Sequence, residues 1–494
     1  MTFYRALRTS LLLLPTLGGC ASIDPRPDYL RVTDSVAASS GIASFDRPNE
    51  LADIQSRADG LLKDGLTADE SIELCLLQNP LVLAAYLRVG IARADVVQAG
   101  LFQNPGLSLA LRLPDGGGLG NFQLSIAQGI ADLWLIPIRK RAAVGVLERE
   151  TLEVARAVGT LALDSRAAYF AALATDRELE IASENQRVAK QLVDVARNRQ
   201  SAGVGSEFDV NLARAELMQT EVSLRNTTLA AFEARRRLAV LLGLTSSPER
   251  LALRDQLPDA PNLKLSDDAL MQAAESSRLD LVATNFAVSA AAARLEQERR
   301  SVISAVEVGL SYETFERGRR GDRPWLADTL WASAEAGRLA VPSLRPREDL
   351  PFDTVLGPTL TFELPIFDQN QAQIARAEFL HQSILADQSA LRLAVVQETR
   401  SARRRAETAW GLATYYRDEF LPLLQTNLEL SREAYRGGKL TVLGVLEAQK
   451  SLLAARARHI AAMRDGAVAT IELEKAVGLP LARIRALEAT TATN

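Results

Sequence analysis

The 494-residue chain is poor in the residues that build most metal sites and disulfide frameworks. It contains two cysteines and two histidines. His381 and His459 lie in separate helical contexts with no Cys or carboxylate at ligand spacing, so we interpret both as surface residues rather than metal ligands. Two cysteines exclude a disulfide framework. We therefore expect no metal centre and no bound cofactor.

Aromatic residues and net charge are also scarce. Aromatics make up 5% of the chain and charged residues 24%, which favours long Ala/Leu/Arg/Glu helices with thin apolar seams over a thick aromatic core. The formal net charge of −4 implies no polyanionic partner, so we expect no nucleic-acid binding. No nucleophile lies beside a base, and the glycines of "PDGGGLGN" precede a strand rather than the helix that a phosphate loop needs. The sequence therefore predicts that the protein is not an enzyme.

Long hydrophobic runs are missing as well. No stretch reaches the roughly 18 apolar residues of a membrane-spanning helix, so we expect any passage through a membrane to use strands. The opening "RALRTSLLLLPTLGGC" has the pattern of a secretory signal peptide over residues 1–19. Its end, Leu17 to Cys20, resembles a bacterial lipobox, which implies cleavage before Cys20 and a covalent lipid on that cysteine. Ala21 replaces the aspartate of inner-membrane retention, which favours the outer membrane.

Residues 20–66 are rich in Pro, Ser and Asp, and we expect them to form an extended leader and anchor. Beyond the leader, Cys75 has no cationic neighbour in the sequence. We interpret Cys75 as a small buried hydrophobe on a helix face.

The most informative feature of the chain is an internal repeat. At an offset of 200, "LVLAA" at Leu81 matches "LVATN" at Leu281. At an offset of 235, "GVGSEFDVNLARAEL" matches "GKLTVLGVLEAQKSL". The coinciding pairs are Gly203/Gly438, Ser206/Thr441, Val210/Val445, Ala213/Ala448 and Leu217/Leu452. The sequence therefore predicts a mainly α fold with a small β part, built from a duplicated unit of helix, strand, strand, very long helix, tight turn and helix.

The patterning sets the bounds of the two units. The first repeat spans 67–244, with a β-hairpin at 105–131, a long helix at 139–201, a tip turn at 202–206 and a return helix. An equatorial connection follows at 245–265. The second repeat spans 266–479, with strands at 305–312 and 355–366 around an external loop at 313–354, a long helix at 369–436, a tip turn at 437–441 and a return helix. Residues 480–494 form a C-terminal tail.

All four strands alternate apolar and polar residues. The side chains that we expect to face lipid are Leu107, Leu109, Leu111, Leu113, Phe122, Leu124, Ile126, Val306, Val308, Leu310, Leu360 and Phe362. Four strands in lipid leave two unpaired edges, which only a closed barrel removes. Three copies of the chain give twelve strands and room for water inside.

The ends of the long helices carry their own signals. Pro137 and Pro365 suit the bend from strand to helix, with Trp134 and Phe367 in an interfacial aromatic belt. At the opposite ends, Gly203 and Gly438 suit tight turns.

The residues that follow these turns are capping residues. Ser206 and Asp209 form the pattern of a capping box, and we expect Thr441 to cap the second return helix in the same way. Asp267 and Asp268 begin a helix after Ser266, where they complement the helix dipole.

Taken together, these residues resemble the TolC family of outer-membrane efflux channel proteins, in its lipid-anchored branch. The resemblance covers about residues 67–479 and is most specific in the two tip signatures and in "GPTLTFELPIFD" at 357–368. It implies a homotrimer with a twelve-stranded β-barrel in the outer membrane, continuous with a long periplasmic α-helical barrel. It also implies docking to a periplasmic adaptor (membrane-fusion) protein and an inner-membrane transporter.

The resemblance also implies site residues. An acidic ring that closes the periplasmic entrance maps onto Glu447, with Asp209 as a weaker gate or cap candidate, whereas the family's other ring position is Gly444 here. A solvated acid on a helix face is the alternative interpretation of Glu447. The residues expected to dock the adaptor are Gly203, Val204, Gly205, Ser206, Gly437, Gly438, Lys439, Leu440 and Thr441.

The sequence thus predicts a passive exit duct of a tripartite efflux system. Two alternatives stay open. One is a duct for protein secretion, since substrate choice resides mostly in the pump. The other is a structural envelope lipoprotein that acts as a spacer. This alternative does not explain why the chain has four amphipathic strands.

Overall fold

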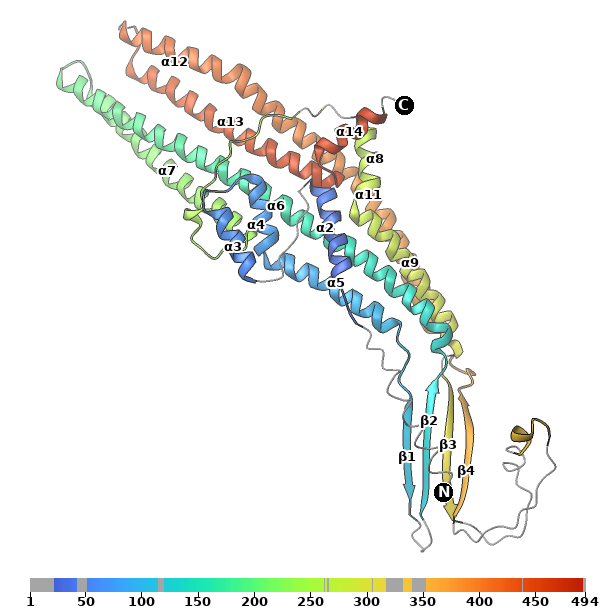
Figure 1. Ribbon diagram of the computed structural model, residues 1–494. Coiled ribbons are helices and arrows are strands. Elements are labelled where there is room, and N and C mark those ends of the chain that lie inside the picture. The colour runs from blue at the N-terminus through green and yellow to red at the C-terminus, as the bar shows by residue number, and fades with distance from the viewer. Residues whose placement is uncertain are drawn as a thin grey trace. The chain divides into compact units, whose positions relative to one another are not determined.

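The computed structural model is mainly helical, with one small antiparallel sheet (Figure 1). It describes residues 22–41, 51–113, 120–261, 263, 266–303, 305–316, 332–339, 352–437 and 439–491. These residues divide into two compact units. A helical unit takes its residues from Met1–Val96, Ala143–Ala290 and Gln382–Asn494, and a sheet unit from Val97–Ala142 and Ala291–His381.

The leader is helical, so the expectation of an extended segment is wrong. It contains α2 (Arg26–Ser40) and α3 (Leu51–Leu62). Val32 and Val36 of α2 are buried against α5 and α6, and the buried Asp28 accepts two hydrogen bonds of 2.6 Å from Arg93 of α5. These tertiary contacts stabilise a helix whose Pro- and Ser-rich sequence predicts none.

The first repeat consists of long helices packed over alanine-rich seams. They are α4 (Ala68–Gln78), α5 (Pro80–Ala99), α6 (Asp132–Ser201) and α7 (Glu207–Leu241). Thr67 and Glu70 form a capping box at the start of α4. Cys75 is fully buried in the core around Tyr169 and Leu238, which confirms its interpretation as a small hydrophobe.

The second repeat has the same order of elements. Its helices are α8 (Asp267–Ser277), α9 (Leu279–Arg300), α11 (Gln371–Tyr415), α12 (Leu421–Arg436), α13 (Val442–Val477) and α14 (Leu481–Thr491). The short 3₁₀ segments are η2 (Pro248–Arg250) and η3 (Ser301–Ile303). Ser266 caps α8, as expected, and Gly243 and Gly478 end the two return helices with matching φ values of 71° and 79°. The equivalent glycines confirm the repeat in the described residues.

Two expected boundaries of the long helices are wrong. Helix α6 begins at Asp132, so Pro137 lies inside its second turn rather than at a bend. A proline so close to a helix start is tolerated because the first N–H groups have no intrahelical acceptor. The second long helix is not continuous, because the π-helix η4 (Tyr416–Phe420) separates α11 from α12.

The two ends of the described chain meet in the helical unit. Arg483 of α14 donates a hydrogen bond of 3.0 Å to the carbonyl oxygen of Ala38 in α2. Gly41, which ends α2 with φ of 70°, lies so close to Pro480 that a Cβ atom there would be 2.8 Å from the proline ring. The leader therefore packs against residues more than four hundred positions later in the chain.

The sheet has the strand order β1-β2-β3-β4, all antiparallel. The strands are β1 (Gly106–Arg112), β2 (Asn121–Gly129), β3 (Val306–Glu316) and β4 (Phe352–Phe362). Strands β3 and β4 therefore reach further into the expected loop 313–354 than the sequence predicts. β1 and β4 are the edge strands.

No single helix within the described residues has both the length and the apolar character needed to cross a membrane. One bent pair, Ala68–Gln78 with Pro80–Ala99, meets the criteria of length and composition together, with a bend of 53°.

Candidate functional site

The register of the sheet places the expected lipid-facing side chains on one face. Leu107, Leu109 and Leu111 pair with Ile126, Leu124 and Phe122, and β2 continues the same face onto β3 through Ile126 and Leu310. Val306 and Val308 then pair with Phe362 and Leu360. The leucines of β1 are exposed in the single chain. An exposed, continuous apolar face is typical of a sheet that contacts lipid or another protein.

The opposite face of the sheet is polar. Ser108, Ser125 and Ser311 form one row across three strands, and the side-chain amide of Asn121 donates a hydrogen bond of 3.0 Å to Glu313. Small side chains keep the strands close on this face: a Cβ atom on Gly309 would lie 2.5 Å from the carbonyl oxygen of residue 126. The sheet thus separates an apolar face from one that water can wet.

The first tip turn joins α6 to α7. Gly203 has φ of 75°, a conformation that glycine adopts without strain. Ser206 Oγ accepts from the backbone N–H of Asp209 at 3.1 Å, and the Asp209 carboxylate accepts from the Ser206 N–H at 3.1 Å and from its hydroxyl at 2.8 Å. The capping box is therefore confirmed. These hydrogen bonds, led by that of the Ser206 backbone, lower the pKa of Asp209.

The second tip turn, between α12 and α13, departs from this pattern. Thr441 occupies the N-cap position, but its side chain makes no capping hydrogen bond, so its expected capping role is wrong. The position three residues later is Gly444, which has no side chain to complete a capping box. Gly444 instead lies against Leu440, with space for no Cβ atom. Gly438 lies outside the described residues.

The tip turns present apolar side chains to solvent. Val204 and Phe208 in the first turn and Leu443 in the second are exposed. Of the three, only Val204 is among the residues that we expect to dock the adaptor. Phe208 and Leu443 extend this surface into the first turns of α7 and α13. The sequence could have indicated Phe208 and Leu443, because both are apolar residues in the first turn of a return helix, directly after a tip turn.

Glu447 lines a small cavity of about 50 Å³ between α6, α7 and α13. Lys450, one turn further along α13, forms an ion pair of 3.1 Å with Glu216 of α7. Towards the tip, Arg199 of α6 donates a hydrogen bond of 3.1 Å to the hydroxyl of Tyr435 and lies 5.7 Å from its ring centroid. These contacts join the two helical hairpins of one chain, and no sequence spacing indicates them.

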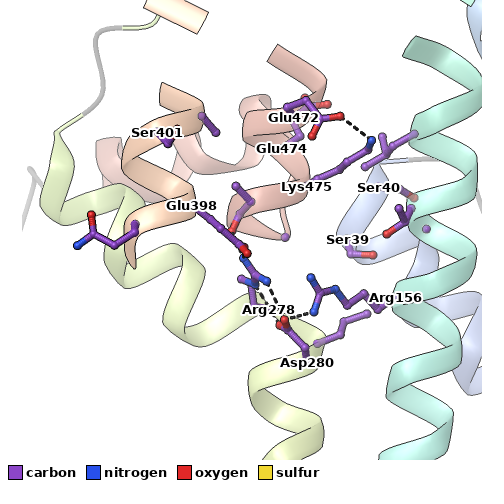
Figure 2. Close-up of a pocket in the computed structure, with 18 of the residues that line it drawn as sticks. Ser39, Ser40, Arg156, Arg278, Asp280, Glu398, Ser401, Glu472, Glu474 and Lys475 are labelled. Atoms are coloured by element: carbon purple, nitrogen blue, oxygen red, sulfur yellow. Dashed lines mark hydrogen bonds and ion pairs between the residues drawn. The ribbon is translucent and has the colours of Figure 1, made fainter. Parts of the chain in front are cut away.

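A larger cavity of about 550 Å³ lies in the helical unit between α2, α6, α9, α11 and α13 (Figure 2). Arg278, which is 2% exposed, donates to both carboxylate oxygens of Asp280 and to Glu398 at 2.6–3.0 Å, and Arg156 also pairs with Asp280. Burial, and then the charge of Arg278, lower the pKa of Arg156.

The charges around this cavity balance. Four cations line it, and so do four carboxylates. Lys475 pairs with Glu472 at 2.8 Å, as Figure 2 shows, and with Asp164 of α6. Arg156, Arg278 and Lys475 each have an acidic partner, so these ion pairs tie the helices together. Sequence analysis missed it, because its members are separated by up to hundreds of residues.

Cys20 and the expected signal peptide lie outside the described residues. Lipidation of Cys20 therefore stays a prediction.

Comparisons with known proteins agree with this geometry. The family model for outer membrane efflux proteins matches residues 270–479. Over 424 residues the chain is 23% identical to the cobalt-zinc-cadmium resistance protein CzcC of Cupriavidus metallidurans, covering 84% of this chain and 90% of that protein. It is 24% identical over 417 residues to protein CyaE of Bordetella pertussis, covering 80% of this chain and 81% of that protein.

Solved structures share the fold. The outer membrane protein VceC of Vibrio cholerae is similar with a TM-score of 0.62 at 18% identity, covering 84% of this chain and 96% of that one. The outer-membrane channel CmeC of Campylobacter jejuni is similar with a TM-score of 0.63 at 14% identity, covering 90% of this chain and 91% of that one. Residues 270–479 thus resemble the outer membrane efflux protein family, and the solved structures that share the fold of the chain include outer-membrane proteins and channels.

Proposed function

We propose that three copies of this chain close a twelve-stranded barrel in the outer membrane, continuous with a periplasmic barrel of helices. The observation that carries the proposal is the sheet register, which collects the apolar side chains of four strands on one exposed face and the polar ones on the other. The edges β1 and β4 run antiparallel to one another in the strand order, so β4 of one copy suits pairing with β1 of the next. Closure removes edges whose unpaired groups cost several kcal/mol each in lipid.

The duct conducts substrate passively, and an inner-membrane transporter supplies the energy. The tip residues around Val204 and Leu440 are the docking surface for a periplasmic adaptor. At rest the tips close the entrance, where three copies of Glu447 attract cations. Asp209 is the weaker gate candidate, since its carboxylate already caps α7. A lipid on Cys20 anchors the leader to the membrane.

Divalent metal cations are the first substrate class to test, because the relative CzcC is named for cobalt, zinc and cadmium resistance. Among the residues that the structure describes, no three His, Cys, Asp or Glu side chains gather in a possible metal site. A conduit that moves cations in water needs no such site. Protein secretion is the alternative cargo, and it requires the same duct.

Strand-face substitutions test the membrane assignment. Leu109→Arg places a charge on the apolar face and is expected to cost about 2–4 kcal/mol at the bilayer midplane. Ser108→Arg, its neighbour on the polar face, is the matched control and is expected to insert normally. The measurement is the fraction of protein recovered in outer membranes after alkaline washing. Equal recovery of both variants contradicts the barrel.

Single-channel conductance in a planar bilayer tests the duct and its gate. We expect small, cation-preferring openings for the wild type and larger ones for Glu447→Ala. Glu429→Ala, which removes an exposed acid of α12, is the control and is expected to leave the conductance unchanged. Absence of conductance in every form, with the protein still associated with lipid, would favour a structural spacer.

A further inference from the structure

The helical unit has a further cavity of about 480 Å³, a groove between α11, η4 and α13. Three arginines line the groove, and they come from both long helices: Arg404 and Arg405 from α11 and Arg458 from α13. The side chains of Thr408 and Tyr416 add two hydroxyl groups to the lining. Because an arginine side chain has donors and no acceptor, the lining is rich in hydrogen-bond donors.

The acids of this groove do not neutralise its arginines. Asp465, the one carboxylate among the described lining residues, lies 2.9 Å from Arg464. Arg405 and Arg458 have no acidic partner in the part of the chain that the structure describes. The third arginine is 83% exposed and has an ion pair of 3.6 Å with Glu407, which contributes little. The groove therefore carries a net positive charge.

Arg405 also lines the larger cavity around Arg278, so the two cavities adjoin at this side chain. The four carboxylates of that cavity have other partners. Glu398 accepts from Arg278 at 2.6 Å, for example, and Glu472 accepts from Lys475 at 2.8 Å. Arg405 therefore stays available to an anion in the groove.

The groove opens away from the short helices α8 and α14. Residues two positions apart on an α-helix point about 160° apart, and Arg403, two positions before Arg405, pairs with Asp267 of α8. On α13, the side chains that pack in one core cluster with α8 and α14 are those of Leu473 and Val477. Helices α8 and α14 thus add a layer to one side of α11 and α13, and the groove lies away from that layer.

This layering places the groove in the proposed duct. A second layer of helices must lie outside the duct, because an inner layer would narrow the passage. The groove then faces the water-filled interior, where soluble ions reach it.

The donors of the groove suit a multivalent oxyanion. Guanidinium groups bind phosphate-type oxygens through paired, charge-assisted hydrogen bonds. An anion with several oxygens accepts from several of these donors at once, whereas chloride carries a single charge. The remaining lining residues are Ala409, Leu412, Ala461 and Ala462, which offer no ligand to a cation.

We propose that this groove binds a soluble, multivalent oxyanion of the phosphate type, held by Arg405 and Arg458 together with the more exposed Arg404. The inference rests on the proposed duct for the position of the groove, and it adds an anion site to a passage whose entrance attracts cations. Without an oxyanion, the arginines repel the cations that pass. A bound oxyanion neutralises this charge and raises the cation preference of the duct.

Equilibrium dialysis of the detergent-extracted, full-length protein against radiolabelled inorganic pyrophosphate tests the site. The dialysis is done in physiological salt, which screens non-specific attraction. We expect one pyrophosphate per chain, and binding at least about tenfold weaker in Arg405→Gln and in Arg458→Gln, because each variant loses charge-assisted hydrogen bonds.

Arg250→Gln is the matched control for these variants. Arg250 lies in η2, is exposed and does not line the groove, so we expect this variant to bind pyrophosphate as the wild type does. Absence of binding to the wild type, or unchanged binding in both groove variants, overturns the proposal. Equal loss of binding in the control also overturns it.

The reversal potential of single channels in a KCl gradient tests the effect on conduction. We expect pyrophosphate to raise the cation preference of the wild type and to leave that of the double variant Arg405→Gln/Arg458→Gln unchanged. Wild-type channels that bind pyrophosphate in dialysis but keep their reversal potential overturn the position of the groove on the conducting path. Pyrophosphate binding by a protein that forms no channel leaves the site standing and overturns the proposed duct instead.

Discussion

The buried ion pair between α2 and α5 offers a sharp test of how the leader is held. Asp28 is 1% exposed and accepts from Nε and Nη2 of Arg93, each at 2.6 Å. Arg93→Met keeps much of the apolar stem and removes both donors. The carboxylate then keeps only Arg31, whose guanidinium is 3.6 Å away on the same helix.

The expected cost follows from the geometry. Removing one partner of a buried ion pair costs about 3–5 kcal/mol. Arg93 is itself 29% exposed and Arg31 remains, so we expect the lower end, about 3 kcal/mol. At about 1.4 kcal/mol for each factor of ten, the population with α2 undocked rises about 100-fold.

Amide hydrogen exchange of α2 measures this population directly. We expect the amides around Val32 and Val36 to exchange about 100-fold faster in Arg93→Met, with exchange in α13 unchanged. Arg26→Met, which removes an exposed guanidinium at the start of the same helix, is the control and is expected to alter exchange little. Unchanged exchange in Arg93→Met would refute the argument that this pair holds the leader.

Three further predictions concern single sites. Burial raises the pKa of Cys75 to about 12, so a maleimide at pH 8 should label it only in denaturant; rapid native labelling contradicts the burial. Gly466→Ala, normally favourable in a helix, should lower the unfolding free energy by about 1–3 kcal/mol, because a Cβ would lie 2.6 Å from Trp410. The pKa of Asp209 is lowered in the folded protein, so its capping hydrogen bonds should stabilise the tip above about pH 4 and weaken as the carboxylate is protonated below that pH. Amide hydrogen exchange of the tip at acidic pH measures this loss, and replacing Ser206 should remove the pH dependence.

The sheet is the part of the fold that the sequence predicts best. Alternation along each strand fixes which side chains share a face, and the pairing of Leu109 with Leu124 and of Val308 with Leu360 follows the predicted apolar face. The capping box of Ser206 and Asp209 was equally predictable, because it depends only on two residues three positions apart. The ends of the strands were harder to predict. Strands β3 and β4 pair with one another beyond their expected ends, in a segment that the sequence assigns to a loop.

The errors occur where distant residues decide the local structure. Nothing within residues 26–40 indicates that Asp28 meets Arg93, and without that contact the segment has little reason to be helical. The ion network around Arg278 depends on Glu398, 120 residues away. Thr441 makes no capping hydrogen bond although it is equivalent to Ser206 in the repeat, and Gly444 occupies the position at which Asp209 completes the first capping box.

The contact between Ala38 and Arg483 has a consequence for the order of events during biogenesis. A chain that emerges from an export machine with its N-terminus first presents α2 long before α14 exists in the same compartment. The leader can fold early, but its last contacts form only after nearly the whole chain has crossed. A truncated product that lacks α14 would therefore lack the contact between Arg483 and Ala38, and its leader would be less tightly packed. Proteases of the envelope could then recognise an unfinished chain by its exposed first residues.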